Sequence, residues 1–213
     1  MRNQNRTDLI ILASDKDVEF ALSGLFSRSE SLGIRHVGLD IFVHPYHDSG
    51  CYKKSGEFLK PYQNHYDHAL VVFDREGCGY EDCNREKIEE TVEKDLSVSG
   101  WNDRARVIVI DPEVEMWIWS DSPHVENALG WNGQNPSLKH WLVSQHYLSE
   151  GQIKPTRPKE SLEAALRKVR KPRSPSIYKQ IAEKVSLNKC VDSSFIKLKE
   201  TLQSWFPVND ACS

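Results

Sequence analysis

Long apolar runs are missing from this chain of 213 residues. The longest unbroken runs, Leu9 to Ala13 and Ala69 to Phe73, hold five residues each, whereas a membrane-spanning helix needs about 20. The first eight residues are mostly polar and contain no apolar segment of the kind found in secretory signals. We therefore expect a cytoplasmic protein with no membrane partner.

Several chemical signatures are missing as well. The sequence contains no glycine-rich P-loop, no Gly-x-Ser-x-Gly motif, no dinucleotide-binding fingerprint and no internal repeat. Its five cysteines, at positions 51, 78, 83, 190 and 212, are odd in number and scattered. This pattern is not that of a disulfide framework and favours reduced thiols. The glycines of Gly77-Cys-Gly79 indicate a turn rather than a phosphate site.

Charge is divided unevenly along the chain, although the net charge is only −3. Residues 154–200 contain 13 Lys and Arg against 5 Asp and Glu, a local charge of +8, and the rest of the chain carries −11. Such a segment can neutralise the phosphates of DNA or RNA or contact an acidic protein. The alternative is a solvated helix face. The candidate binding residues are Arg167, Lys168, Arg170, Lys171 and Arg173.

Short apolar runs at 9–13, 69–73 and 107–110 are typical of strands buried on both faces. Residues 37–43 alternate in the manner of a strand nearer the sheet edge. Helical spacing of apolar residues fills 18–26, where Ser14 is a candidate cap, and 85–99. We interpret 44–54 as a loop. The alternation of strands and helices predicts a doubly wound, mostly parallel α/β domain over residues 7–150.

A helical and basic segment is predicted over residues 151–207. One helix ends at Pro172, a second begins at Ser174-Pro175, and Asp192 caps a third. Between the sheet and this segment, Glu113–Ser120 and Pro136–Val143 are predicted to form short helices. No strand is expected after Pro112, so we expect the C-terminal helices to pack on the α/β domain.

Acidic residues follow three of the predicted buried strands. Because parallel strands end at one edge of a sheet, where ligands usually bind, these carboxylates can converge there. Oxygen ligands of this kind suit Mg²⁺ or Mn²⁺. The competing interpretation is that they cap helices and turns. The residues are Asp15 and Asp17, then Asp74 and Glu76, then Asp111, Glu113 and Glu115.

Histidines and cysteines offer an alternative metal site, because zinc accepts nitrogen and sulfur ligands. Their spacing is poor for zinc, since no Cys-x-x-Cys pair occurs. Solvated or hydrogen-bonded histidines are therefore the favoured interpretation. The residues concerned are His44, His47, His65, His68, Cys51, Cys78 and Cys83.

Two motifs carry a resemblance to known families. Asp74-Arg-Glu76-Gly77 after an apolar strand resembles the acidic motif of Toprim-type domains, the metal-dependent fold shared by topoisomerases, primases and several defence nucleases. Glu113-Val-Glu115-Met-Trp117 resembles a helix of Toprim-like small proteins encoded beside restriction and antiphage genes. The chain as a whole resembles the small fourth component of methylation-associated bacterial antiphage defence systems. The further segments that carry this likeness are His44-Pro, Asp48-Ser-Gly-Cys51, Phe73-Asp-Arg-Glu-Gly-Cys-Gly79, Ile110-Asp-Pro-Glu, Ser120-Asp-Ser-Pro-His-Val125 and Arg170-Lys-Pro-Arg-Ser174.

The resemblance implies antiphage defence as the process, with other proteins of the same system, or DNA or RNA, as partners. For a nuclease it implies that Asp74 and Glu76 hold Mg²⁺ or Mn²⁺, with Asp15 as a displaced third carboxylate and Glu115 as supporting ligand or base. One position departs from the pattern, because Ala13 and Ser14 stand where Toprim enzymes have a catalytic glutamate. We therefore expect a component that binds a partner, and keep the metal-dependent nuclease as the alternative.

Overall fold

A computed structural model describes residues 6–208 of the chain. Its centre is a four-stranded sheet in which all neighbouring strands are parallel, in the order β2-β1-β3-β4. The prediction of an α/β fold with a parallel sheet and a helical C-terminal part is confirmed. The strands are β1 (Thr7–Ala13), β2 (Leu39–Val43), β3 (Tyr66–Asp74) and β4 (Ala105–Ile110).

Helices fill most of the remaining chain. Those between the strands are α1 (Lys16–Phe26), α2 (Ser29–Leu32), α3 (His47–Leu59) and α4 (Arg85–Leu96), with the short turns η1 (Lys60–Tyr62), η2 (Ser97–Trp101) and η3 (Asn102–Arg104). After β4 follow α5 (Glu115–Ile118), α6 (Pro123–Leu129), α7 (Leu138–Ser144), α8 (Pro158–Lys168), α9 (Pro175–Ala182), η4 (Leu187–Lys189) and α10 (Ser193–Trp205).

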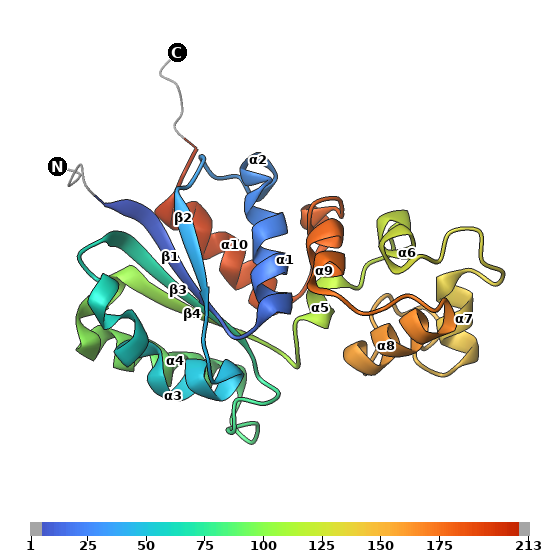
Figure 1. The fold of residues 1–213 in the computed structure, drawn as a ribbon, viewed down its shortest axis with the longest axis horizontal. Coiled ribbons are helices and arrows are strands. Elements are labelled where there is room, and N and C mark those ends of the chain that lie inside the picture. Colours follow the sequence, from blue (N-terminus) through green and yellow to red (C-terminus); the bar gives the residue numbers. More distant parts are fainter. Residues whose placement is uncertain (1–5, 209–213) are drawn as a thin grey trace, which may run out of the picture.

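Each face of the sheet has its own core, because alternate side chains of a strand point to opposite faces. On one face, Ile10 and Leu12 of β1 pack with residues of α3 and α4. On the other, Leu9 and Ile11 pack with α1, α9 and α10. Figure 1 shows these two helical layers on either side of the strands. One face is therefore covered by helices close in sequence, and the other mainly by helices from the C-terminal part.

The C-terminal part also extends beyond the sheet. Figure 1 shows α6, α7 and α8 to one side of the strands, at the opposite side of the molecule from the first residues of β1 and the end of α10. Leu129, Leu142 and Leu162 of these helices nevertheless belong to the same apolar cluster as β1 and α1. The strands and the C-terminal helices thus share one continuous core.

The expectation of a loop over residues 44–54 is wrong, because α3 begins at His47. The helix has few apolar residues and includes two glycines, which are usually poor helix formers. Both glycines are buried at close contacts: a Cβ at Gly50 would collide with the His44 ring, and one at Gly56 would collide with Asp95. The glycines therefore serve packing here and do not mark a turn.

Three other helix predictions need correction. The N-cap of α1 is Asp15, whose Oδ1 accepts the Val18 N–H at 2.9 Å, and not Ser14. The helix expected over Glu113–Ser120 is only the single turn α5. Helix α6, with Ser122 as its N-cap, was not predicted. The predicted cap Asp192 is confirmed, since it accepts the N–H groups of the first turn of α10.

Within residues 6–208, no helix is both long and apolar enough to cross a lipid bilayer. Cys212 lies outside the described residues, and the four cysteines within them, at positions 51, 78, 83 and 190, are free thiols.

Candidate functional site

The carboxyl ends of β1, β3 and β4 lie side by side, because the strands pair in parallel with Ala13 opposite Val72 and Asp74 opposite Ile110. The residues that follow the strands are therefore brought to one edge, which is where α/β proteins usually bind ligands. The segments near positions 15, 74 and 113 therefore lie at the same edge of the sheet, as predicted. We call this region the carboxyl edge.

Asp74 is one of the buried carboxylates of the carboxyl edge. The residue is only 7% exposed, and no described residue donates a hydrogen bond to its Oδ1. Burial raises the pKa of Asp74 well above its ordinary value, and the negative charges of Asp48, Glu115 and Asp15 raise it further. The side chains predicted at positions 15, 74 and 115 thus lie close enough to influence one another.

Asp48, in the first turn of α3, was not predicted as a site residue. Its Oδ1 accepts the backbone N–H of Asp74 at 2.9 Å, so it ties α3 to the end of β3. Burial raises the pKa of Asp48, while that hydrogen bond acts in the opposite direction. Asp48 follows β2, as Asp15 follows β1. The sequence signal for Asp48 is therefore an acidic residue after the second strand, which was not among the strands considered.

Asp15 already has a structural role, since its Oδ1 caps the N-terminus of α1. An aspartate at this position satisfies a backbone N–H that has no partner inside the helix. The interpretation of strand-end acids as capping residues thus applies to Asp15. Its carboxylate lies near Asp74 but is directed to the backbone of its own helix.

Glu115 is held by Tyr178 of α9 and by Arg173, which lies between α8 and α9. It is 1% exposed, and its Oε1 accepts hydrogen bonds from the Tyr178 hydroxyl and, at 2.9 Å, from Arg173. Arg173 also contacts Asp17 at 2.7 Å and Glu163 at 3.2 Å. We call these five residues the Arg173 clasp. It joins the start of α1, the segment after β4 and the C-terminal helices.

The pKa values within the Arg173 clasp follow from its burial. Burial raises the pKa of Glu115, although the Tyr178 hydrogen bond and the charge of Arg173 act against this. Asp17 behaves in the same way, since burial raises its pKa and Arg173 partly offsets the rise. For Arg173, the neighbouring acidic groups outweigh burial and raise the pKa, so the guanidinium stays charged.

Glu113 lies beside the clasp and is 3% exposed. Its Oε1 accepts the backbone N–H of Lys159 at 3.0 Å, and its Oε2 lies 3.5 Å from the Lys159 ammonium. Burial, followed by the charge of Glu115, raises the pKa of Glu113 to about 7. The charge of Glu113 therefore changes near neutral pH.

Glu76 does not join the other predicted ligands, because its side chain is exposed beyond the end of β3. Asp111 is exposed too and pairs with Arg75 at 2.9 Å. Within residues 6–208, no group of three or more His, Cys, Asp or Glu side chains has a geometry that can hold a metal ion. The set of Asp15, Asp74 and Glu76 predicted for Mg²⁺ or Mn²⁺ is thus not assembled in this arrangement.

Two of the histidines considered as zinc ligands, His44 and His68, make other contacts. The His44 Nδ1 accepts the Tyr46 N–H at 3.1 Å, and its ring lies 5.4 Å from that of Phe58. His68 stacks on Trp205 with ring centres 4.4 Å apart. The His44 contact agrees with the interpretation of solvated or hydrogen-bonded histidines, whereas His68 is packed against an aromatic ring.

The glycines after β3 form a turn around a carboxylate. Gly77 and Gly79 both have positive φ angles, of 89° and 85°, and their N–H groups donate to Glu81 Oε1 at 2.9 and 3.0 Å. The hydrogen bond from its own backbone N–H, followed by those from the glycines, lowers the pKa of Glu81 below its ordinary value. The turn interpretation of this motif is therefore confirmed, with a side chain of the same loop as the acceptor.

The five basic residues predicted to bind nucleic acid or a partner are used in different ways. Arg173 lies in the clasp, and the Lys171 ammonium donates to the carbonyl of Ala128 at 2.6 Å. Arg167 is 68% exposed and lies 3.6 Å from Glu163. Lys168 and Arg170 are exposed. Only Arg167, Lys168 and Arg170 therefore present their charges mainly to solvent.

A comparison of the chain with protein-family models, with curated proteins and with solved structures finds no match.

Proposed function

We propose that this chain is a component of a bacterial antiphage defence system of the methylation-associated type, and that it engages another protein of that system without hydrolysing nucleic acid. The proposal rests on the resemblance described above and on the state of the carboxyl edge. There, two of the acids that a Toprim-type nuclease would use, Asp15 and Glu115, are engaged by the protein itself.

The observation that carries the proposal is the Arg173 clasp. Glu115, the predicted supporting ligand or base, is bound by Arg173 and Tyr178. Asp15, the predicted third carboxylate, caps α1. Each of these two carboxylates is thus held by a partner inside the protein. A catalytic group that is misplaced by about 1 Å already lowers the reaction rate roughly a hundredfold. This arrangement supports a carboxyl edge that anchors the C-terminal helices on the sheet.

A protein partner is favoured over nucleic acid because few charges remain free for phosphates. Two of the five predicted contacts, Lys171 and Arg173, are used inside the molecule. Loss of such contacts weakens the electrostatic attraction that dominates nucleic-acid binding. Nucleic-acid binding is therefore an outcome to be measured, and its affinity must fall steeply with salt if Arg167, Lys168 and Arg170 contact phosphates.

The second candidate function is a divalent-metal-dependent nuclease of the Toprim-like type. One observation favours it: the Oδ1 atom of Asp74 is buried with no donor among the described residues. Buried polar atoms normally have a hydrogen-bond partner, so an atom without one calls for an explanation. Asp74 would be the central residue of such an activity, and no reaction step is assigned because Glu76 lies outside the group.

Two assays on the parent protein, Asp74→Ala and Asp82→Ala separate these functions, with the exposed Asp82 as the matched control. The first incubates each protein with plasmid, linear and single-stranded DNA and RNA in Mg²⁺ and in Mn²⁺. The second measures phage protection, and co-purification with the products of adjacent genes, in cells.

We expect no cleavage by any of the three proteins, together with stable co-purification of at least one neighbouring gene product. Cleavage that disappears in Asp74→Ala and persists in Asp82→Ala would establish the nuclease in place of the proposal. Absence of any co-purifying protein, with phage protection unaffected by deletion of the gene, would reject the proposal.

A further inference from the structure

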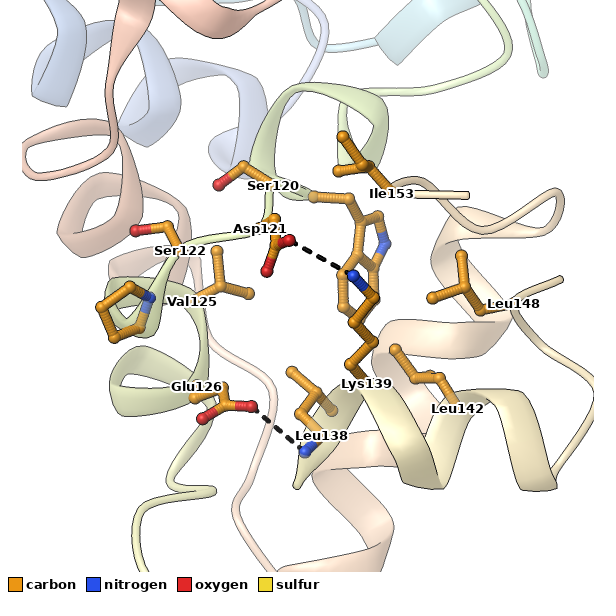
Figure 2. A pocket seen from close by; sticks show the side chains of 12 residues that line it. Ser120, Asp121, Ser122, Val125, Glu126, Leu138, Lys139, Leu142, Leu148 and Ile153 are labelled. Carbon is orange, nitrogen blue, oxygen red and sulfur yellow. Dashed lines mark hydrogen bonds and ion pairs between the residues drawn. The ribbon is translucent and has the colours of Figure 1, made fainter. Parts of the chain in front are cut away.

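A cavity of about 190 Å³ lies in the helical region beside the sheet, between α6, α7 and the segments that precede α6 and α8. Figure 2 shows its walls, which come from several elements and are largely aliphatic and aromatic. It does not overlap the carboxyl edge. The apolar lining residues are Trp119, Val125, Leu138, Leu142, Leu148 and Ile153.

The cavity is held open by polar contacts between its walls. Glu126 Oε1 accepts the backbone N–H of Leu138 at 3.2 Å, which ties α6 to the start of α7. Asp121 and Lys139 form an ion pair at 3.2 Å across the cavity, as the dashed line in Figure 2 shows. The indole of Trp119 donates to the carbonyl of the first residue of α8 at 3.0 Å. The walls are therefore positioned independently of any occupant.

The size and lining of this cavity indicate the chemistry of an occupant. Protein interiors are normally packed without voids larger than a water molecule. An apolar cavity of about 150 Å³ is large enough to bind benzene, so this one accommodates a single aromatic ring or a branched aliphatic side chain. Of its three charged side chains, Asp121 and Lys139 neutralise each other, and Glu126 accepts the backbone N–H of Leu138. The occupant is therefore a bulky, uncharged, apolar group.

The terminal residues offer few apolar side chains for this cavity. Residues 1–5 and 209–213 contain no leucine, isoleucine, valine or aromatic residue, and their one large apolar side chain is that of Met1. Ile153, at the cavity, is 56% exposed and extends the apolar surface outward, where a second molecule can cover it. Peptide segments are commonly recognised by one apolar anchor side chain in such a pocket.

We propose that this cavity is the anchor pocket for one leucine-sized to phenylalanine-sized side chain on a segment of a partner protein. This inference rests on the proposed function, because it specifies how the partner is recognised. The polar groups around the cavity then face the backbone of the bound segment, and Ile153 covers the anchor from outside.

The first test uses methyl NMR on the full chain with labelled Ile, Leu and Val. The probes are N-acetyl-leucine methylamide and N-acetyl-phenylalanine methylamide, with N-acetyl-glycine methylamide as the control lacking a side chain. For ligands of this size we expect a Kd on the order of 1 mM. The shifts should be confined to the methyl groups of Val125, Leu138, Leu142, Leu148 and Ile153. No shift, or equal shifts with the glycine probe, would overturn the inference.

The second test uses Ile153→Glu, which places a charge at an exposed position of the cavity and therefore spares the core. Val98→Glu is the matched control, because Val98 is 83% exposed and lies in η2, next to α3 and α4. We expect Ile153→Glu to reduce co-purification of the partner protein at least tenfold and Val98→Glu to leave it unchanged. Equal co-purification by both variants would refute the anchor pocket while the proposed function stands.

Two further outcomes are informative. If no variant and no parent protein retains a partner, the proposed function fails, and the leucine and phenylalanine probes alone decide whether the cavity binds apolar side chains. If the chain self-associates with increasing concentration and Ile153→Glu abolishes this, the occupant is a second copy, and the assignment to a different protein is wrong.

Discussion

The C-terminal helices are tied to the α/β core by two cations, Arg173 and Lys197, whose surroundings differ. Arg173 bridges Asp17 and Glu115 at the carboxyl edge. Lys197, on α10, lies beside β4 and contacts Glu89 at 3.1 Å and Glu93 at 3.2 Å. Both cations come from more than 55 residues later in the chain than these acidic side chains, Lys197 from α10 and Arg173 from the segment between α8 and α9.

The Lys197 contacts complete the edge of the sheet. Strand β4 is an edge strand, and its outward backbone groups need partners. Glu93 Oε1 accepts the N–H of Val107, Glu89 Oε1 accepts the N–H of Val109, both at 3.0 Å, and Lys197 donates to the carbonyl of Val107 at 2.9 Å. Three side chains thus take the place of a fifth strand and prevent edge-to-edge pairing.

The Arg173 clasp satisfies no backbone group of the sheet. Its contacts run between ionisable side chains, and it lies where parallel sheets bind ligands. Lys197 therefore completes the fold, whereas Arg173 binds carboxylates at the candidate site. Substitutions at the two cations, and at the acids around them, test this distinction.

The largest effect is expected for Lys197→Met, which keeps the apolar stem and removes the charge. Glu89, whose side chain is 5% exposed, then loses its closest cation and keeps only the more distant Arg85 at 3.6 Å, and the Val107 carbonyl loses a donor. Removing one partner of a buried ion pair typically costs about 3 kcal/mol or more. We expect the free energy of unfolding, measured by urea denaturation, to fall by about 3 kcal/mol.

Lys184→Met is the matched control, since Lys184 is exposed just after α9. Its free energy of unfolding should stay within about 0.5 kcal/mol of the parent value. Equal effects of the two substitutions would show that Lys197 does not complete the sheet edge, and the comparison with Arg173 would lose its basis.

Arg173→Met should have a smaller and pH-dependent effect. Without Arg173, Glu115 and Asp17 remain buried as anions at pH 8, but both already have a raised pKa because of burial. They can therefore take up protons as the pH falls, which removes the penalty. We expect a loss of about 2 kcal/mol at pH 8 and a clearly smaller loss at pH 5, measured by urea denaturation at both values.

A loss that is the same at pH 5 and pH 8 would contradict this account of the clasp. Phage protection by the Arg173→Met variant then measures whether the clasp also contributes to function. If Arg173→Met abolishes protection at a temperature where the variant remains folded, the clasp contributes to function as well as to stability.

Much of the fold can be predicted from the sequence because its signals are local. The apolar runs that form β1, β3 and β4 are those of strands buried on both faces, and the parallel sheet follows from the helices between them. The Asp192 cap is equally local, since it contacts the next two or three residues. For the same reason, the convergence of acids at the carboxyl edge follows from strand order alone.

What could not be predicted depends on contacts between distant residues. Arg173 lies 156 positions from Asp17, so a basic run in the sequence does not reveal that one of its members binds several acids. The first part of α3, within residues 47–54, was predicted as a loop because the glycines of this helix are explained only by the His44 and Asp95 side chains that pack against them. Asp48 was missed together with that helix.

Glu113→Gln is the third prediction and concerns the acid next to the clasp. The pKa of Glu113 is raised from 4.5 to about 7, first by burial and then by Glu115. Between these values the folded protein holds a proton that the unfolded chain releases, so stability falls as the pH rises. Glutamine stays neutral and can still accept the Lys159 N–H. We expect the variant to be more stable than the parent by about 1 to 2 kcal/mol at pH 8, and similar at pH 4.

Thermal or urea unfolding at pH 4, 6 and 8 measures this difference. Glu57→Gln is the control, because Glu57 is exposed on α3, and it should not alter the pH profile. If Glu113→Gln leaves the pH dependence of stability unchanged, a group other than Glu113 titrates in this range. The distinction between the carboxyl edge and the β4 edge would then be weakened.

The smallest effect is expected at Asp15, which lies at the carboxyl edge but caps a helix, much as Glu89 and Glu93 complete a strand. Asparagine is as good an N-cap as aspartate, whereas alanine cannot accept the Val18 N–H. Asp15→Ala should therefore lower the free energy of unfolding by about 1 kcal/mol, and Asp15→Asn should leave it nearly unchanged with phage protection intact. If Asp15→Asn keeps its stability and loses protection, the negative charge itself is required. Asp15 then belongs with the acids that act at the site, and the nuclease becomes the better account of the carboxyl edge.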